Sequence, residues 1–320
     1  MGGAVDAQER VRARRLSAAV RWPRFKSQFA LQSMVWPGIL FLVLFSYMPM
    51  YGILIAFQDY DLFQGVMNSP WVGFKHFQEF VNDPNFLNVL RNTLAMNLLA
   101  LIFGFPAPIV FALFLNELNN RRFKRIVQTI SYLPHFVSWV IFGGLVLTVL
   151  SPSNGILNLL LTSLHIIDEP INFIAKPHLF WIIMVLAEIL KGIGWGAIIY
   201  IAAIAGVDQE MYDAAKIDGA GRFARMWYVT LPAIMGTVVI MLIFAISSIL
   251  NTGFEQIMVL QNPLNLDVSE TIDTYVYKVG LQQMRYSYST AVGLAKSVVA
   301  LILLFAANYV SRKVTDNSLF

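Results

Sequence analysis

The sequence predicts an all-α membrane protein with about six transmembrane helices. Hydrophobic residues make up 57% of the 320 residues and charged residues only 13%, about half the charged share of a typical soluble domain. The mean hydropathy is +0.62. Several uncharged runs exceed the roughly 20 residues that an α-helix needs to cross a bilayer. One of them covers residues 126–167.

The predicted spans differ in length and regularity. The first apolar run is too long for one upright span, and Pro37 and Pro49 predict a kink or an interfacial extension. After the third span, the turn residues that follow Ser151 should break the chain, which leaves Ile156–Ile167 as a short interfacial or re-entrant helix. The six predicted spans are 29–57, 92–116, 126–150, 179–204, 231–255 and 290–311.

The distribution of Lys and Arg predicts the orientation. Seven of the 23 basic residues lie in the first 26 positions, so residues 1–28 are expected to form a basic cytoplasmic or interfacial arm and residues 29–320 a transmembrane domain. With both termini in the cytoplasm, sixteen basic residues face that side and four lie in the outer loops. The positive-inside rule favours this orientation, and the basic cluster indicates contact with membrane lipid rather than with nucleic acid.

Several classes of chemistry find no support in the sequence. The chain has no cysteine, which excludes a disulfide framework, an iron–sulfur cluster and a thiol nucleophile. No GxxxxGK[ST] phosphate loop is present, and the four histidines are scattered without carboxylates at ligand spacing. We therefore expect a non-catalytic chain without a metal or cofactor of its own.

A polar segment, residues 205–232, separates the fourth and fifth predicted spans. Asp208 is suited to cap a helix of about three turns that continues to Ile217. Gly219 is placed to adopt the left-handed conformation after the helix ends, and Pro232 to stand in an early turn of the next span. Such a helix either lies at the membrane interface or docks to a soluble partner.

The stretch DAAKIDGAGRFARMWYVTLP, residues 213–232, resembles the EAA loop of permease subunits from binding-protein-dependent ABC importers. The family pattern is E-A-A, three residues, G, nine residues, I, one residue and L-P. Asp213 replaces the glutamate and Val229 the isoleucine, while the spacing is unchanged. The stretches FSYMPMYGILIAFQDYDLFQG, SPWVGFKHFQEF and SYLPHFVSWVIFGGL are also similar to oligosaccharide-type permeases, in particular to the polysaccharide-associated branch of type I importers.

This resemblance implies a set of partners. It implies a heterodimer with a second permease subunit, two cytoplasmic ATPase subunits that bind ATP and Mg, and a periplasmic solute-binding protein. ATP-driven closure of the ATPase pair would switch a pore in the bacterial inner membrane between inward- and outward-facing states. The implied substrate is an oligosaccharide, with acidic, alginate-type sugars as one candidate. The implied ATPase-coupling residues are Met211, Asp213, Ala214, Ala215, Lys216 and Gly219.

Polar residues within two spans are candidates for the substrate pathway, because such residues usually face a cavity or another helix. An indole platform combined with amides and hydroxyls would suit a sugar. The structural alternative is that Glu188 and Lys191 neutralise each other and that the serine, asparagine and threonine side chains join helices. The candidates are Glu188, Lys191 and Trp195 on one face of the fourth span and Ser248, Asn251, Thr252 and Glu255 on one face of the fifth.

Other polar residues in the spans receive different interpretations. Lys191 and Lys296 would offer counter-charges to an acidic sugar, whereas Asn97 and His135 are expected to serve helix packing. The main alternative function is an ion- or proton-coupled secondary transporter of a small polar solute, with Glu188 or Glu255 as the carrier. Twelve spans or inverted repeats would favour that class. The loops expected to receive the binding protein are 59–88 and 256–289.

Overall fold

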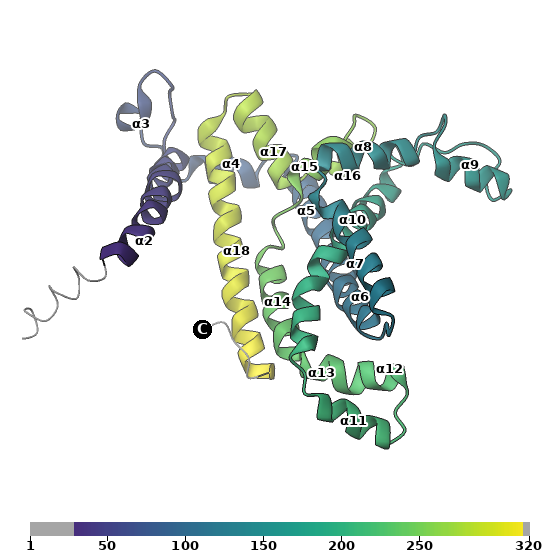
Figure 1. Ribbon diagram of the computed structural model, residues 1–320. Coiled ribbons are helices and arrows are strands. Elements are labelled where there is room, and N and C mark those ends of the chain that lie inside the picture. Colours follow the sequence, from purple (N-terminus) through teal and green to yellow (C-terminus); the bar gives the residue numbers. More distant parts are fainter. Residues whose placement is uncertain (1–28, 316–320) are drawn as a thin grey trace, which may run out of the picture.

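The computed structural model describes residues 29–315, which form helices and loops, with no β-strand in that range (Figure 1). The predicted basic arm, residues 1–28, lies outside the described residues. Within residues 29–315, four helices are long and apolar enough to cross a membrane, and six spans result if each of two bent helix pairs counts as one. The predicted all-α class and the number of spans are therefore confirmed.

Four predicted spans are unbroken helical rods, and two of these contain π-helical or 3₁₀-helical segments. They are the first span, α2 (Phe29–Leu42), η1 (Val43–Tyr47) and η2 (Met48–Phe57); the second, α5 (Phe86–Leu99), η3 (Ala100–Gly104) and α6 (Pro106–Asn116); the fourth, α10 (Pro177–Ala205); and the sixth, α18 (Tyr286–Thr315).

Prolines explain where these rods depart from α geometry. The π-helical turns η1 and η3 end two residues before Pro49 and Pro106, respectively. A proline ring clashes with the carbonyl four residues earlier and supplies no amide hydrogen. A wide turn at that point relieves the clash, so the rod continues past the proline. The predicted irregularity of the first span is therefore located between Val43 and Phe57.

The third predicted span, 126–150, is wrong as a single helix. α7 (Arg121–Phe136) and α8 (Trp139–Val149) meet at a bend of 105°. The break is built locally by Ser138, whose Oγ accepts a hydrogen bond from the amide of Ile141 and so caps α8. Since α7 begins with four basic residues among its first five, its start is polar and only α8 is apolar throughout.

The fifth predicted span, 231–255, is wrong at both ends. The helix formed by α12 (Arg222–Arg225), η4 (Met226–Thr230) and α13 (Leu231–Ala233) bends by 67° into α14 (Met235–Ser247). Pro232 therefore precedes the bend instead of opening the span. α14 ends at Ser247, and the chain is not helical again until α15 (Phe254–Leu260).

The remaining elements are short and lie in the connections. Asn158 holds one of them, α9, because its amide donates to the carbonyls of Ser151 and Ile171, both at 2.9 Å. The predicted short helix from Ile156 is confirmed, although it ends at Ser163. These elements are α3 (Gly65–Asn68), α4 (Lys75–Val81), α9 (Ile156–Ser163), α11 (Gln209–Ile217), α16 (Leu266–Ser269), α17 (Ile272–Tyr277) and η5 (Lys278–Gln282).

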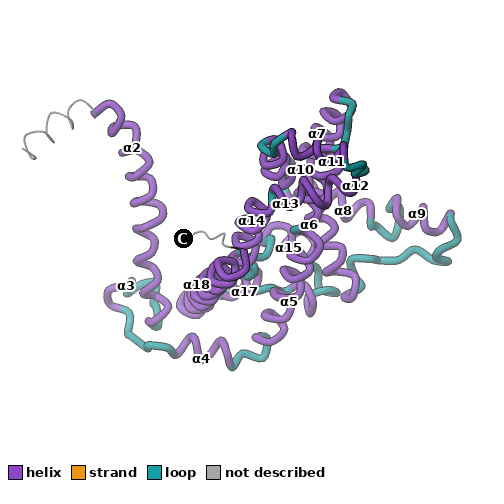
Figure 2. The backbone as a smooth tube through the Cα atoms, turned by 90° about the horizontal axis from the view of Figure 1, so that it is seen from below, coloured by secondary structure: helices purple, strands orange, loops and turns teal. Residues whose placement is uncertain are grey.

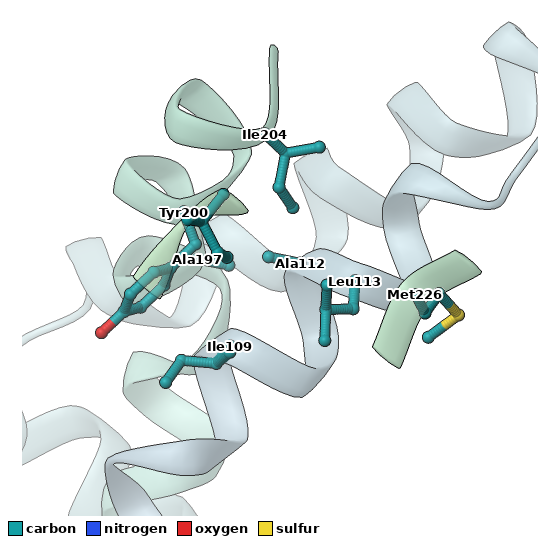
Figure 3. Close-up of a cluster of buried hydrophobic side chains, with 8 residues drawn as sticks. Ile109, Ala112, Leu113, Ala197, Tyr200, Ile204 and Met226 are labelled. Atoms are coloured by element: carbon teal, nitrogen blue, oxygen red, sulfur yellow. The ribbon is translucent and has the colours of Figure 1, made fainter. Parts of the chain in front are cut away.

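A buried apolar cluster joins α6, α10 and η4 (Figure 3). Ala112 of α6 and Ala197 of α10 are fully buried, and such small residues let two helices approach closely. Met226 of η4 packs into the same cluster. α11 and α12 lie beyond one end of the bundle and α17 near the other, while α2 stands apart from the remaining helices in both views (Figures 1 and 2).

Candidate functional site

Helix α11 is fixed by its own sequence. Asp208 accepts a hydrogen bond from the amide of Glu210 at 2.9 Å, as an N-cap does. At the other end, the amide of Ala220 donates to the carbonyl of Ala215 at 2.9 Å, and Gly219 has a φ of 78°. These are the features of a Schellman motif, so the predicted cap and the predicted left-handed glycine are both present.

The outer surface of α11 combines charged and apolar side chains. Lys216 donates to Asp213 at 2.8 Å, and this hydrogen bond together with the charge of Lys216 lowers the pKa of Asp213. Met211 is half exposed and Ile217 is 87% exposed. An exposed isoleucine of this kind on a helix beyond the end of the bundle (Figure 1) is available to a partner. The EAA spacing did not single out Ile217, although its position at the helix end before Gly219 could have done so.

Between the membrane helices lies a cavity of about 300 Å³. Its wall comes from α5, η3, α6, α10 and the end of α14. Four polar residues line it: Asn97, Glu188, Ser248 and Asn251. A small adjoining space shares Asn97 and Glu188 and is also lined by Thr252. The structure thus brings together four of the seven predicted pathway residues, and it places Asn97 on the wall where the sequence indicated only packing.

The predicted shared face of the fifth span does not exist, because α14 ends at Ser247. Ser248 and Asn251 line the cavity from a non-helical segment, and Glu255 is an exposed residue in the first turn of α15. Thr252 lines the adjoining space but is not held there by a helix. Its Oγ1 donates a hydrogen bond to Asp273 at 3.0 Å, which fixes its position.

Lys191 has a structural role that the sequence did not reveal. Its ammonium group is buried and donates to the backbone carbonyls of Pro134 at 3.1 Å and His135 at 2.8 Å. These carbonyls belong to the last turn of α7, where a positive charge is favourable; that of Pro134 also accepts from the amide of Val137 at 3.3 Å. The nitrogen also lies 5.3 Å from the ring centre of Trp139. No ion pair joins it to Glu188, so the predicted mutual neutralisation is wrong.

Trp195 faces a different cavity from Glu188. Its ring stacks on His135 with the ring centres 4.4 Å apart, and it lines an apolar cavity of about 620 Å³. Phe105 and Pro108 line both this cavity and the polar one, so the two are neighbours. The predicted packing role of His135 agrees with this stacking.

Lys296 does not offer a free charge, because it forms an ion pair with Asp273. The other oxygen of Asp273 accepts hydrogen bonds from the amide and the hydroxyl of Thr252, at 3.2 and 3.0 Å. The pair therefore connects α18, α17 and the non-helical segment after α14. Among residues 29–315, no group of three His, Cys, Asp or Glu side chains is arranged to hold a metal ion.

Comparisons with known proteins agree with this architecture. Residues 84–316 match the family described as binding-protein-dependent transport system inner membrane component. The chain is 48% identical to protein LplB of Bacillus subtilis (strain 168) over 89% of each chain. It is 45% identical to the polygalacturonan/rhamnogalacturonan transport system permease protein YteP of the same organism, over 91% of this chain and 90% of that one.

Two crystal structures have the same fold. The chain superposes on a bacterial ABC transporter involved in the import of the acidic polysaccharide alginate with a TM-score of 0.84 and 38% identity, over 92% of this chain and 99% of that one. It superposes on an alginate ABC transporter in complex with alginate pentasaccharide-bound periplasmic protein with a TM-score of 0.85 and 37% identity, over 93% and 99%.

The family match and the superpositions give this fold its class, which is that of the permease subunit of a type I ABC importer. The chain belongs to the family of binding-protein-dependent transport system inner membrane components. It is a non-catalytic translocation subunit of the inner membrane. The secondary-transporter alternative is therefore not supported.

Proposed function

We propose that this permease subunit imports acidic oligosaccharides of the uronate type. The observation that supports this proposal most strongly is the likeness over nearly the whole chain to transporters named for acidic polysaccharides, polygalacturonan in one case and alginate in others. Alginate itself is one candidate and oligogalacturonate another, and both carry one carboxylate on each sugar unit.

The polar cavity suggests how this chain would contact such a sugar. Asn97, Ser248 and Asn251 offer amide and hydroxyl groups for sugar hydroxyls, and Glu188 accepts hydrogen bonds from them. Since Lys191 and Lys296 are already engaged by protein groups, neither of these two lysines is free to hold a uronate tightly. A wall of this kind favours passage, because a transported solute must leave its site as readily as it enters.

The exposed helix α11 supplies the second half of the proposal. We infer that Met211, Asp213, Ala214, Ala215, Lys216 and Gly219 contact one of two ATPase subunits, which hold ATP and Mg. The end of the bundle that carries α11 then faces the cytoplasm, and both termini lie on that side. The opposite end, with loops 59–88 and 256–289, would receive the periplasmic binding protein, and a second permease subunit would complete the pore.

Co-purification from native membranes tests this function. The chain is captured from detergent-solubilised membranes, and recovery of an ATPase and a second permease is expected. The complex is then reconstituted with its binding protein and tested with alginate, galacturonate and neutral gluco-oligosaccharides of equal length. Stimulation of ATP hydrolysis by the acidic sugars is expected. Stimulation by the neutral sugars alone would contradict the substrate class, and solute movement by the isolated chain without ATP would contradict the whole proposal.

A further inference from the structure

A chain of polar contacts connects α11 to the membrane helices. Tyr212 of α11 places its hydroxyl 3.1 Å from the hydroxyl of Thr230. Thr230 donates its own proton to the carbonyl of Arg225 at 3.3 Å, so it accepts from Tyr212. The guanidinium of Arg225 in turn lies 3.7 Å from the carboxylate of Glu117, at the end of α6.

The burial of these groups indicates that the contacts are built into the fold. Thr230 is 1% exposed, and the side chains of Arg225 and Glu117 are each 18% exposed. Removing half-buried charges from water is costly unless they are paired. Met226 anchors the same turn in the core between α6 and α10, which keeps Arg225 beside α6.

Glu117 stands where a carboxylate is otherwise unfavourable. It is the C-cap of α6, and the negative end of a helix dipole repels an acid there. Its pairing with Arg225 offsets this repulsion. A second contact, between the rings of Phe114 and Phe223 with centres 6.4 Å apart, also joins α6 to α12. The end of α6 is thus held to α12 by one ionic and one aromatic contact.

α6 continues from this point to the polar cavity. Pro108, near its other end, lines the cavity, as do Gly104 and Phe105 in the turn before it. A helix of eleven residues, about 16 Å long, moves as a unit when one end is displaced. A push on α11 therefore has a continuous path of contacts to the cavity wall.

We propose that Glu117, Arg225, Thr230 and Tyr212 are positioning residues that transmit the movement of α11 to α6, and through α6 to the cavity. This inference rests on the proposed function, in which an ATPase subunit pushes on α11. The four residues touch neither ATP nor sugar in that scheme. Their contribution is to make ATP hydrolysis and sugar movement occur together.

The test measures sugar uptake and ATP hydrolysis in the same proteoliposomes, which contain the complete complex, with an acidic oligosaccharide and its binding protein. Thr230→Val removes the hydroxyl and keeps the shape, whereas Thr230→Ser keeps the hydroxyl. Glu117→Gln removes the charge of the acid. Arg222→Gln is the control, because it changes an exposed arginine of α12, the helix that also carries Arg225. We expect uptake per ATP hydrolysed to fall about fivefold or more in Thr230→Val and Glu117→Gln, the lower range of ordinary coupling between sites. Thr230→Ser and Arg222→Gln should match the wild type.

Each outcome has one meaning. Unchanged uptake per ATP in both Thr230→Val and Glu117→Gln overturns the inference, even when the wild-type complex transports as proposed. If Glu117→Gln does not assemble, Thr230→Val and Tyr212→Phe decide, since neither removes a charge. A wild-type complex in which acidic sugar neither moves nor stimulates hydrolysis contradicts the proposed function instead.

Discussion

The loop that carries α11 and the segment that follows α14 both interrupt apolar helices, but they are held by interactions of different range. Asp208 and Gly219 fix α11 through contacts within a few residues. The segment after α14 is fixed from elsewhere in the chain, by Asp273 and, through it, by Lys296. A structure determined locally keeps its shape when it is pushed by a partner, whereas one determined by distant helices changes when those helices move. The first suits a contact with an ATPase and the second a wall that opens and closes.

The largest effect is expected from breaking the long-range contact. Asp273→Asn leaves Lys296, whose side chain is 13% exposed, without a counter-charge, and the loss of one partner from a buried pair destabilises a protein by about 3 kcal/mol or more. The apparent midpoint of thermal unfolding in detergent should fall clearly. The double variant Asp273→Leu with Lys296→Met removes both charges and should recover most of the loss. A double variant no more stable than the single one would contradict this account.

The next effect comes from the local contact. Gly219 has a φ of 78°, and a Cβ there would meet open space, so any penalty arises from the backbone conformation alone. A β-branched residue in that conformation costs about 1–2 kcal/mol, which should fray the end of α11. We expect Gly219→Val to lower sugar uptake about tenfold while the amount of protein in the membrane is unchanged. Gly219→Asn should retain much of the activity, because asparagine tolerates the left-handed region. Equal uptake in both variants would show that φ is not the constraint.

A smaller effect is expected at the cavity wall. Asn251→Ala removes one amide that faces the cavity, and a hydrogen bond of this kind contributes about 1 kcal/mol. The sugar concentration that half-maximally stimulates ATP hydrolysis should rise about fivefold. Ser247→Ala is the matched control, because the hydroxyl of Ser247 donates to the carbonyl of Phe244 within its own helix and does not line the cavity. An equal rise of the half-maximal sugar concentration in Asn251→Ala and Ser247→Ala would contradict a contact between the sugar and Asn251 at the cavity wall.

The smallest effect concerns another long-range contact, at the end of the bundle opposite to α11. Burial acts to raise the pKa of Asp83, but hydrogen bonds from Tyr275 at 2.6 Å, Tyr288 and the amide of Asn85 outweigh it, so the pKa lies below its usual 3.8. Ionised Asp83 thus stabilises the folded state above about pH 4, and this contribution is lost as the pH falls through the lowered pKa.

The expected observation follows from that sign. The difference in thermal midpoint between the wild type and Asp83→Asn should be constant from about pH 7 to pH 5 and shrink toward pH 3. A difference that grows on acidification would contradict the assignment. Tyr275→Phe provides the control, because it removes the 2.6 Å donor without changing a charge.

The sequence predicted the parts of the fold that depend on composition and on neighbouring residues. The apolar runs gave the spans, and Asp208 and Gly219 gave the ends of α11. The bend between α7 and α8 was missed because an uncharged run reads through it. Ser138, a cap residue four positions after Pro134, was the available local signal. The stabilisation of this bend by Lys191 has no local signal in the sequence, because Lys191 lies 56 and 57 residues from the two carbonyls that it binds.

The candidate site was predicted in part for the same reason. Helical spacing assigned Glu188 to the substrate pathway, and α10 is continuous there. The same spacing correctly assigned Ser248 and Asn251 to the cavity wall but wrongly placed them on a helix, because α14 ends before them. Lys296 could be recognised as a cation in a span, but its partner, Asp273, lies in another helix. Sequence patterns identify polar residues in a membrane without showing which of them are already paired.

The first two segments of the N-terminal span, α2 and η1, make little contact with the rest of the chain, whereas η2 packs on α18. Only 6% of the span's most apolar window is buried. Among its side chains that the structure describes, only Ala56, in η2 beside α18, is fully buried. It also precedes residue 84, where the match to the family begins. Exchanges among large apolar residues over 32–51 would therefore leave the packing within this chain intact, which makes this stretch a natural place to attach a label or to graft the span of a relative.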